Sequence, residues 1–178
     1  MEISQAIEKR RSIRLYTSGK IPNEDIESIV HAGEMAPSWK NTQVPRYYAV
    51  KSAEMKRKLK ECLPARNSNN TRNASCFIVI CFEKGLSGYA KNGSPDNEIG
   101  GNWGYFDCGL ACQNMALKAY DMGYGTLVMG VRDEKKIRDL LSVPPSQSIT
   151  AILAIGHPAI DPSAPRRKPV KDILKIYE

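Results

Sequence analysis

The stretch Cys76-Phe77-Ile78-Val79-Ile80-Cys81-Phe82 decides the fold class. It is an uninterrupted apolar run, and such a run predicts a strand of a sheet that is covered on both faces. Strands that alternate with helices predict an α+β protein, an α/β sandwich of two or three layers. Further strands are predicted over 47–50, 126–131 and 149–155, and helices over 2–10, 22–36, 53–63, 104–122 and 133–141.

Two segments are expected to be irregular. Residues 64–75 are polar and rich in Asn, which predicts a loop. Residues 84–103 contain five Gly, one Pro and three Asn and end at Trp103. Long irregular segments of compact domains are often lids or binding loops, so this one is either a mobile cover over a site or a plain surface loop. The end of the chain, residues 170–176, is expected to be a short helix or an extended tail.

The length and the net charge of the chain narrow the range of functions. A chain of 178 residues has the size of one domain, so residues 1–178 are expected to form a single unit. The net charge of +7 favours an anionic partner, such as a phosphorylated cofactor, a nucleotide or a nucleic acid. The cations are spread over several elements and are not gathered on one face with aromatic residues, so we expect no nucleic-acid binding. No signal-peptide pattern and no apolar run long enough to cross a bilayer occur, so we expect a cytoplasmic protein without membrane contact.

A short basic cluster, Arg10-Arg11-Ser12-Ile13-Arg14, follows the first predicted helix. Arg offers a planar fork of donors that suits phosphate, and the Ser hydroxyl adds one more. Basic runs are more often solvated surface, but a second set near the other end, Arg166-Arg167-Lys168, strengthens the phosphate interpretation. A polar turn over 36–43 lies between the two sets. A small ligand with a phosphate and a polar ring would use all three.

Other site types are not favoured. The five cysteines are odd in number and form no CxxC, so a disulfide framework is not expected. Cys108 and Cys112 share one face of a predicted helix, and we interpret them as small buried hydrophobic residues rather than half of a metal site or a redox pair. His31 and His157 have no ligand partners nearby, so no metal is expected. The Gly-rich run 123–130 follows a helix and precedes a strand, the reverse of a dinucleotide fingerprint.

Five motifs together resemble those of the FMN-dependent nitroreductase family. Residues 10–16, RRSIRLY, resemble its RRSxRxF opening, and residues 36–43, APSWKNTQ, resemble its APSxxNxQPW turn. Residues 107–117 resemble its DxGxAxQNLxL helix, and residues 123–130, GYGTLVMG, resemble its GLGTxWxG segment. The C-terminal part of the chain resembles the family's closing motif, G(Y/H)P…RxP, through Gly156-His157-Pro158 followed by Arg166-Arg167-Lys168-Pro169. The motifs occur in family order and span nearly the whole chain.

The resemblance implies a nitroreductase-like fold, with a central, mostly antiparallel sheet flanked by helices. It also implies a domain-swapped-type homodimer with FMN at the interface, where each flavin is touched by both chains. The activity implied is ping-pong reduction of nitroaromatics, quinones or similar small-molecule acceptors with NADH or NADPH, without a catalytic side chain. The alternative is a flavin-binding protein of the same fold with a specialised role, dehalogenase-like or flavin-fragmenting, or with no catalytic role.

The family's cofactor contacts map onto three parts of this chain. The phosphate group would be held by the basic cluster, with Arg167 and either Arg166 or Lys168 closing on it. The flavin ring would lie against the turn of the partner chain and against the segment whose backbone N–H faces flavin N5, and Asn67 would add a further contact. The residues matched are Arg10, Arg11, Ser12 and Arg14; Pro37, Ser38, Trp39, Asn41 and Gln43; and Leu127, Met129 and Gly130.

Three departures from the family pattern affect the expected site. Val44-Pro45 follows Gln43 where the family usually has Pro-Trp, so an aromatic residue is missing from the turn. Leu127-Val128-Met129 replaces the more common residues before Gly130, which leaves flavin N5 with backbone contact only. The chain is also short for the family, with little beyond residues 84–103 to build a substrate pocket.

Overall fold

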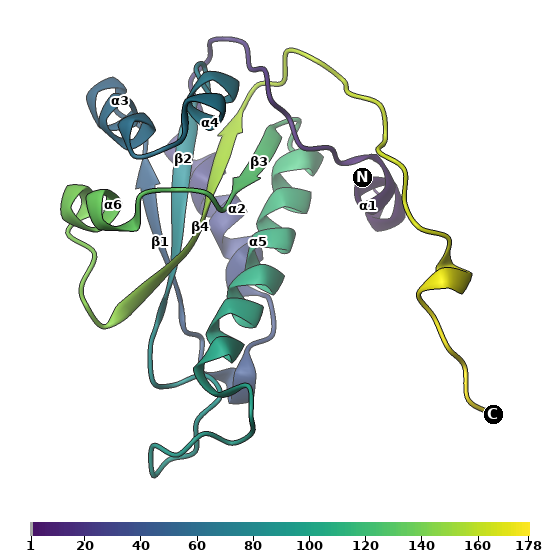
Figure 1. Ribbon diagram of the computed structural model, residues 1–178. Helices are drawn as coiled ribbons and strands as arrows, with labels where there is room; N and C mark the ends of the chain where they lie inside the picture. Colours follow the sequence, from purple (N-terminus) through teal and green to yellow (C-terminus); the bar gives the residue numbers. More distant parts are fainter. Residues whose placement is uncertain (1) are drawn as a thin grey trace.

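A computed structural model describes residues 2–178 of the chain, and Met1 lies outside the described part. Four strands form one sheet in the order β1-β2-β4-β3, and every neighbouring pair is antiparallel (Figure 1). The strands are β1 (Pro45–Val50), β2 (Cys76–Glu83), β3 (Gly125–Met129) and β4 (Gln147–Gly156). This confirms the predicted α+β class and its antiparallel central sheet.

Helices cover both faces of the sheet, which makes the sandwich three layers deep (Figure 1). Helices α2 and α5 pack on one face, and α3 and α6 pack on the other. The α-helices are α1 (Ile3–Lys9), α2 (Asn23–Glu34), α3 (Ala53–Glu61), α4 (Ala65–Asn70), α5 (Trp103–Asp121) and α6 (Glu134–Leu141); three short 3₁₀ helices are η1 (Trp39–Asn41), η2 (Gly100–Asn102) and η3 (Val170–Asp172). Within residues 2–178, no helix is both long and apolar enough to span a membrane.

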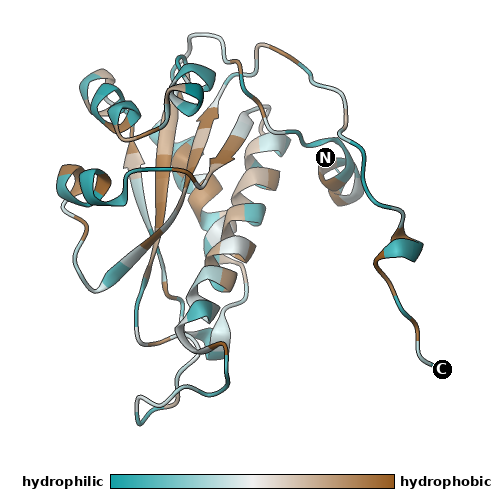
Figure 2. Ribbon diagram, in the orientation of Figure 1, coloured by the Kyte–Doolittle hydropathy of each residue, from teal (hydrophilic) through white to brown (hydrophobic). Residues whose placement is uncertain are grey.

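Strand β2 lies in the middle of the core, as its uninterrupted apolar run predicts. Its odd-numbered residues over 77–81 pack with Leu59 of α3 and Ile137 of α6. Its even-numbered residues over 76–82 pack with Ile29 of α2 and Met115 of α5. Because side chains alternate along a strand, both faces of β2 must be apolar to fill both layers. Hydrophobic residues accordingly concentrate along the strands and the inner faces of the helices (Figure 2).

Close packing of α2 on α5 depends on Gly33. A Cβ atom at this position would lie 2.8 Å from Cγ of Met115 and 3.2 Å from the hydroxyl of Tyr47. The glycine therefore lets the last turn of α2 approach α5 closely. The helix ends at Glu34, just before Ala36-Pro37, as the proline predicts.

The predicted loop over 64–75 is partly wrong, because α4 lies within it. Pro64 precedes the helix with a φ of −56°, a value already close to helical geometry. At the other end, the backbone N–H and the hydroxyl of Thr71 both donate to the carbonyl of Asn67, at 3.2 and 2.7 Å. These local bonds hold one and a half turns of helix despite the low helix propensity of Asn. Residues 84–102 also contain some structure, a Tyr89–Pro95 bridge and η2, and α5 begins at Trp103.

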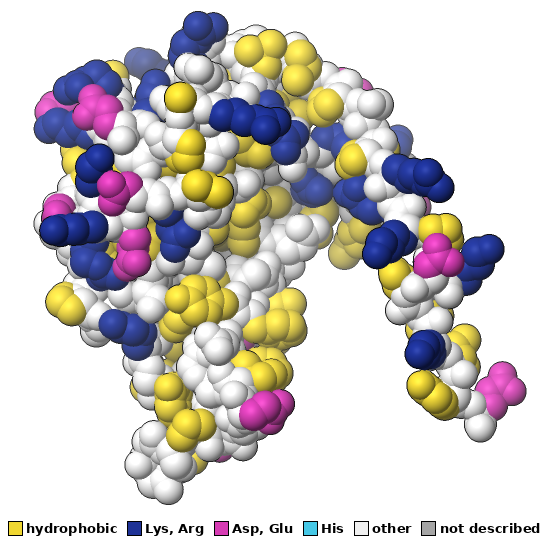
Figure 3. Space-filling view, in the orientation of Figure 1, with side chains coloured by type: hydrophobic (Ala, Val, Ile, Leu, Met, Phe, Trp, Pro, Cys, Tyr) yellow, Lys and Arg dark blue, Asp and Glu magenta, His cyan; other side chains and the backbone are white. Residues whose placement is uncertain are grey.

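Both ends of the chain leave apolar side chains uncovered. Helix α1 buries only Ala6, and the segment after Pro158 stands away from the body (Figures 1 and 3). Exposed apolar residues on these two segments are Ile3, Ile7, Ile160, Val170, Ile173, Leu174, Ile176 and Tyr177. Burial of such surface is the main favourable term in protein association, so these segments are suited to contact another chain.

Candidate cofactor site

The basic cluster is fixed along the edge strand β3. Ser12 forms a parallel bridge with Thr126, and the Ile13 N–H donates to the Thr126 carbonyl at 2.8 Å. Gly125 makes this approach feasible, because a Cβ there would lie 2.6 Å from Cγ1 of Ile13. The arginines before and after Ile13 therefore have a defined position next to the sheet.

The cluster meets the C-terminal tail around a cavity of about 230 Å³. The structure thus brings together five predicted residues from opposite ends of the chain. Arg166 and Lys168, by contrast, do not line this cavity and are exposed. The lining residues are Arg10, Arg11, Ser12, Arg14, Pro162, Ser163, Pro165 and Arg167.

This cavity is strongly positive. Burial, followed by the nearby Arg11 and Arg167 cations, lowers the pKa of Arg10. Within residues 2–178, the buried Nε atom of Arg10 has no hydrogen-bond partner, and Arg14 donates only to the Ser12 carbonyl, at 3.3 Å. None of the described residues that line the cavity is Asp or Glu. A multiply charged anion with several acceptor oxygens would relieve both the repulsion and the unmet donor.

A second cavity, of about 410 Å³, adjoins the first through Arg14. One side is apolar and comes from β3 and the residues after it, and the other is polar and comes from α4. Such a lining suits a flat ring with a polar edge. The residues are Arg14, Pro64, Arg66, Asn67, Asn70, Leu127, Val128 and Val131. Arg66 and Asn70 were not predicted; they lie on the helix that the Asn-rich composition concealed.

Strand β3 ends at Met129, between Val128 and Val131, which line this second cavity. Met129 is buried, whereas Gly130 is exposed, and a Cβ added at Gly130 would contact nothing within 4 Å. Arg132 holds this segment, because its guanidinium donates to the carbonyl of Gly130 at 2.6 Å and to the carbonyl of Ile149. Arg132 was also missed from the sequence, where nothing distinguishes it from other surface arginines.

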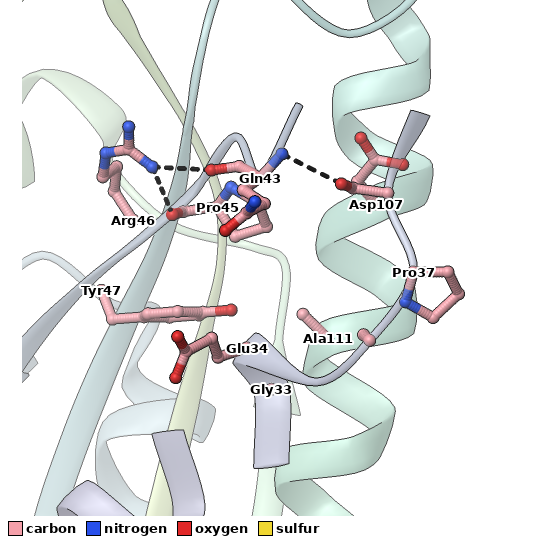
Figure 4. Close-up of a pocket in the computed structure, with 11 residues that line it drawn as sticks. Gly33, Glu34, Pro37, Gln43, Pro45, Arg46, Tyr47, Asp107 and Ala111 are labelled. Carbon is pink, nitrogen blue, oxygen red and sulfur yellow. Dashed lines mark hydrogen bonds between the residues drawn. The ribbon is translucent and has the colours of Figure 1, made fainter. Parts of the chain in front are cut away.

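The polar turn opens into a separate cavity of about 180 Å³ (Figure 4). Pro37, Ser38 and Gln43 line it, together with residues of α2, β1 and α5. It shares no lining residue with the two cavities that contain Arg14. A single chain therefore does not bring the turn into the cavities that contain Arg14.

The turn is held in an unusual backbone conformation. Lys40, Asn41 and Gln43 all have positive φ, between 46 and 56°. Such residues cost about 1–3 kcal/mol each and persist only where surrounding contacts impose them. Here the Trp39 N–H donates to the buried Asp107 carboxylate at 3.0 Å, and the Gln43 N–H donates to the Ser38 hydroxyl at 2.9 Å.

None of the five cysteines lines any of these three cavities. All five are free thiols and are buried. Cys108 and Cys112 pack in the core, as predicted, and burial raises the pKa of each to about 11. Among residues 2–178, no group of three His, Cys, Asp or Glu side chains is placed to hold a metal ion.

Comparison with known proteins shows to which family the chain is related. The model of the nitroreductase family matches residues 7–157. The chain is 34% identical to "Putative NADH dehydrogenase/NAD(P)H nitroreductase" of Archaeoglobus fulgidus over 88% of this chain and 86% of the relative. It is 27% identical to the NADPH-flavin oxidoreductase of Vibrio harveyi, over 96% of this chain and 71% of the relative.

Solved structures agree on the fold. A "putative nitroreductase in complex with fmn" from Desulfovibrio desulfuricans is 28% identical, with a TM-score of 0.80 over 100% of this chain and 98% of the other. A nitroreductase family protein of Streptococcus pneumoniae, 17% identical, matches in fold with a TM-score of 0.87 over 99% of this chain and 100% of the other. The family match over most of the chain, together with a relative above 30% identity, shows that the protein belongs to the nitroreductase family.

Proposed function

We propose that the protein is an FMN-dependent oxidoreductase that uses NADH or NADPH to reduce electron-poor acceptors such as quinones and nitroaromatics. The observation that carries the proposal is the pair of cavities joined at Arg14. One contains a cluster of guanidinium groups and has no Asp or Glu among the described residues that line it, and the other is apolar with a polar rim. FMN combines a phosphate with a flat polar ring and matches both.

The residues present fit this cofactor. The buried, unpartnered Nε of Arg10 and the free donors of Arg14 would bind the phosphate, with Arg11, Ser12 and Arg167 around it. The ring would lie between Leu127 and the side chains of α4, Asn67 among them. The backbone from the buried Met129 to the exposed Gly130 would face the ring. Arg166 or Lys168 would close on the phosphate from the tail.

The protein's part in the reaction is binding, orientation and charge stabilisation. FMN, when bound, supplies two-electron transfer between a reduced nicotinamide and an acceptor. Arg14 and Arg66 would favour negative charge on the bound ring, because oriented cations next to a developing charge cost no reorganisation. Donor and acceptor would occupy the same space in turn, which predicts ping-pong kinetics.

The proposed unit is a domain-swapped-type homodimer. The turn with Pro37, Ser38, Trp39, Asn41 and Gln43 lies apart from its own chain's basic cavity, so it would contact the ring bound by the partner. The uncovered apolar residues of α1 and of the tail would then pack on the partner. Relatives named as an NADPH-flavin oxidoreductase and as an NADH dehydrogenase/NAD(P)H nitroreductase support the activity.

Steady-state kinetics test the activity. The FMN-loaded protein is assayed for NADH and NADPH oxidation over a grid of menadione concentrations, with free FMN as the control. We expect turnover with parallel double-reciprocal lines, and a dimer by light scattering. A protein that binds FMN but oxidises neither nicotinamide would contradict the reductase proposal and favour the specialised or non-catalytic alternative. Intersecting double-reciprocal lines would contradict the ping-pong mechanism, in which donor and acceptor occupy the same space in turn.

A further inference from the structure

A large cavity lies apart from the proposed cofactor site, next to the start of α3. Its volume is about 640 Å³. It is lined by the segment that leads into α2, the residues just after β1, the first turn of α3 and the residue before β2. It shares no lining residue with the cavities that contain Arg14 or with the cavity at the polar turn. The proposed function therefore makes no use of it.

Three lysines from separate parts of the chain meet at this cavity, and we call them the lysine cluster: Lys20, Lys51 and Lys56. Lys20 precedes α2, Lys51 follows β1, and Lys56 belongs to α3. The first turns of α2 and α3 contain three acidic residues, but no described residue that lines the cavity is Asp or Glu. Like charges that lie close together without a counter-charge repel one another, so the cavity favours an anion.

Two of the three ammonium groups are held in position by neighbouring oxygens. The half-buried Lys56 donates to the carbonyls of Ala74 and Ser75, at 3.0 and 3.2 Å. Lys51, also half-buried, donates to the side-chain oxygen of Asn23 at 2.5 Å. An ammonium group has three donors, so each of these lysines keeps at least one donor for a ligand. Side chains that are already fixed lose less freedom when a ligand binds.

We propose that the lysine cluster binds the phosphate group of a small organic phosphate, of about the size of a nucleotide. A phosphate monoester carries about two negative charges at neutral pH and offers three acceptor oxygens, which matches three converging ammonium groups. Ligand pockets measure about 300–1,000 Å³, so an inorganic phosphate ion would leave most of this cavity unfilled. Ile21 and Ala53 line the same cavity and supply apolar contacts for the organic part.

Calorimetric titration of the full chain, saturated with FMN, tests the site without turnover. The probes are AMP, inorganic phosphate and citrate, each at two salt concentrations. We expect AMP to bind saturably, to bind more weakly at high salt, and to bind more tightly than the other two probes. Inorganic phosphate that binds as tightly as AMP would overturn the assignment to an organic phosphate. Citrate that binds more tightly than AMP would overturn the assignment to a phosphate group.

Variants of the lysine cluster locate the bound AMP. Lys20 is exposed and its ammonium donates to no described residue, so Lys20→Ala should fold normally. Its Kd for AMP should rise roughly three- to tenfold, and Lys20→Ala/Lys51→Ala should show a larger rise. Lys20→Arg keeps the charge and should retain the wild-type Kd.

The matched control is Lys135→Ala, which removes an exposed lysine of α6 that lines none of these cavities and changes the net charge equally. Its Kd for AMP should equal that of the wild-type protein. Absence of AMP binding in the wild-type protein would overturn the proposal. An AMP affinity that is the same in Lys20→Ala/Lys51→Ala as in Lys135→Ala would place the ligand elsewhere and would also overturn it. Neither result bears on the reductase proposal, because the measurement is AMP binding and not turnover.

Discussion

Arg14 is the residue on which both cofactor cavities depend, so its removal is the sharpest perturbation. It lines both the cavity at the basic cluster (the basic cavity) and the cavity between β3 and α4 (the ring cavity). Among the residues that the structure describes, its guanidinium donates only to the Ser12 carbonyl, at 3.3 Å. Most of its five donors are thus free for a ligand. The side chain is exposed and does not support the core, so Arg14→Ala should fold normally.

The expected magnitude follows from the bond that is lost. A charge-assisted hydrogen bond contributes about 1.5–3 kcal/mol, so the Kd for FMN should rise roughly 10- to 150-fold. Arg14→Lys keeps the charge but loses the planar fork and should fall between the wild-type protein and the alanine variant. Arg57→Ala removes an exposed arginine on α3, paired there with Glu61, and controls for the change in net charge.

The assay is titration of the apoprotein with FMN, followed by quenching of flavin fluorescence at two salt concentrations. Binding should weaken with salt in the wild-type protein, and less steeply in Arg14→Ala, because screening reduces a charge–charge attraction. If Arg14→Ala binds FMN as tightly as Arg57→Ala does, the assignment of the phosphate to this cavity is wrong.

Three further predictions concern the scaffold. Gly125→Ala would place a Cβ 2.6 Å from Ile13, so we expect a loss of about 1–3 kcal/mol in the free energy of unfolding; an unchanged melting temperature would refute the close approach of the basic cluster to β3. Ser142 closes α6 with a φ of 52°, so Ser142→Gly should raise the melting temperature by relieving about 1 kcal/mol of strain, and a lower value would contradict this. Burial raises the pKa of Cys81 to about 12 and that of Cys108 to about 11 from an ordinary 9.0, so their contribution to stability is complete below pH 9 and is lost as pH rises toward these values. The urea concentration at the midpoint of unfolding should accordingly decrease when the pH is raised from about 8.5 to about 10.5. An unchanged midpoint would show that the thiols are not buried in the native state.

Much of the fold could be predicted from the sequence because the strongest signal comes from the most buried element. The alternating side chains of β2 fill both layers of the core, so every residue over 76–82 must be apolar. Helix α6 was also predictable, since Asp133 accepts the Lys136 N–H at its start. Helix α4 was not, because local hydrogen bonds from Thr71 to the Asn67 carbonyl outweigh the poor helix propensity of its Asn residues.

The site was predictable where its residues are clustered in the sequence. The arginines of residues 10–14 meet Arg167 because the tail runs back along the N-terminal segment, where Pro158 forms a bridge with Tyr16 and the Ala159 N–H donates to the Leu15 carbonyl. Their charge made them conspicuous in the sequence. Arg66 and Arg132 could not be singled out, since their roles depend on which carbonyl or cavity the fold places beside them. The separation of the turn from the basic cavity is likewise a property of three-dimensional packing that no linear spacing reveals.

The basic and ring cavities are proposed to hold one FMN molecule together. The most direct measurement is the absorbance spectrum of the purified protein, followed by release and identification of any bound cofactor. We expect the two visible absorbance bands of a flavin, release of FMN, and rebinding of added FMN by the stripped protein. A colourless protein that does not take up added FMN would contradict the claim, and the arginine cluster would then need a different anionic ligand.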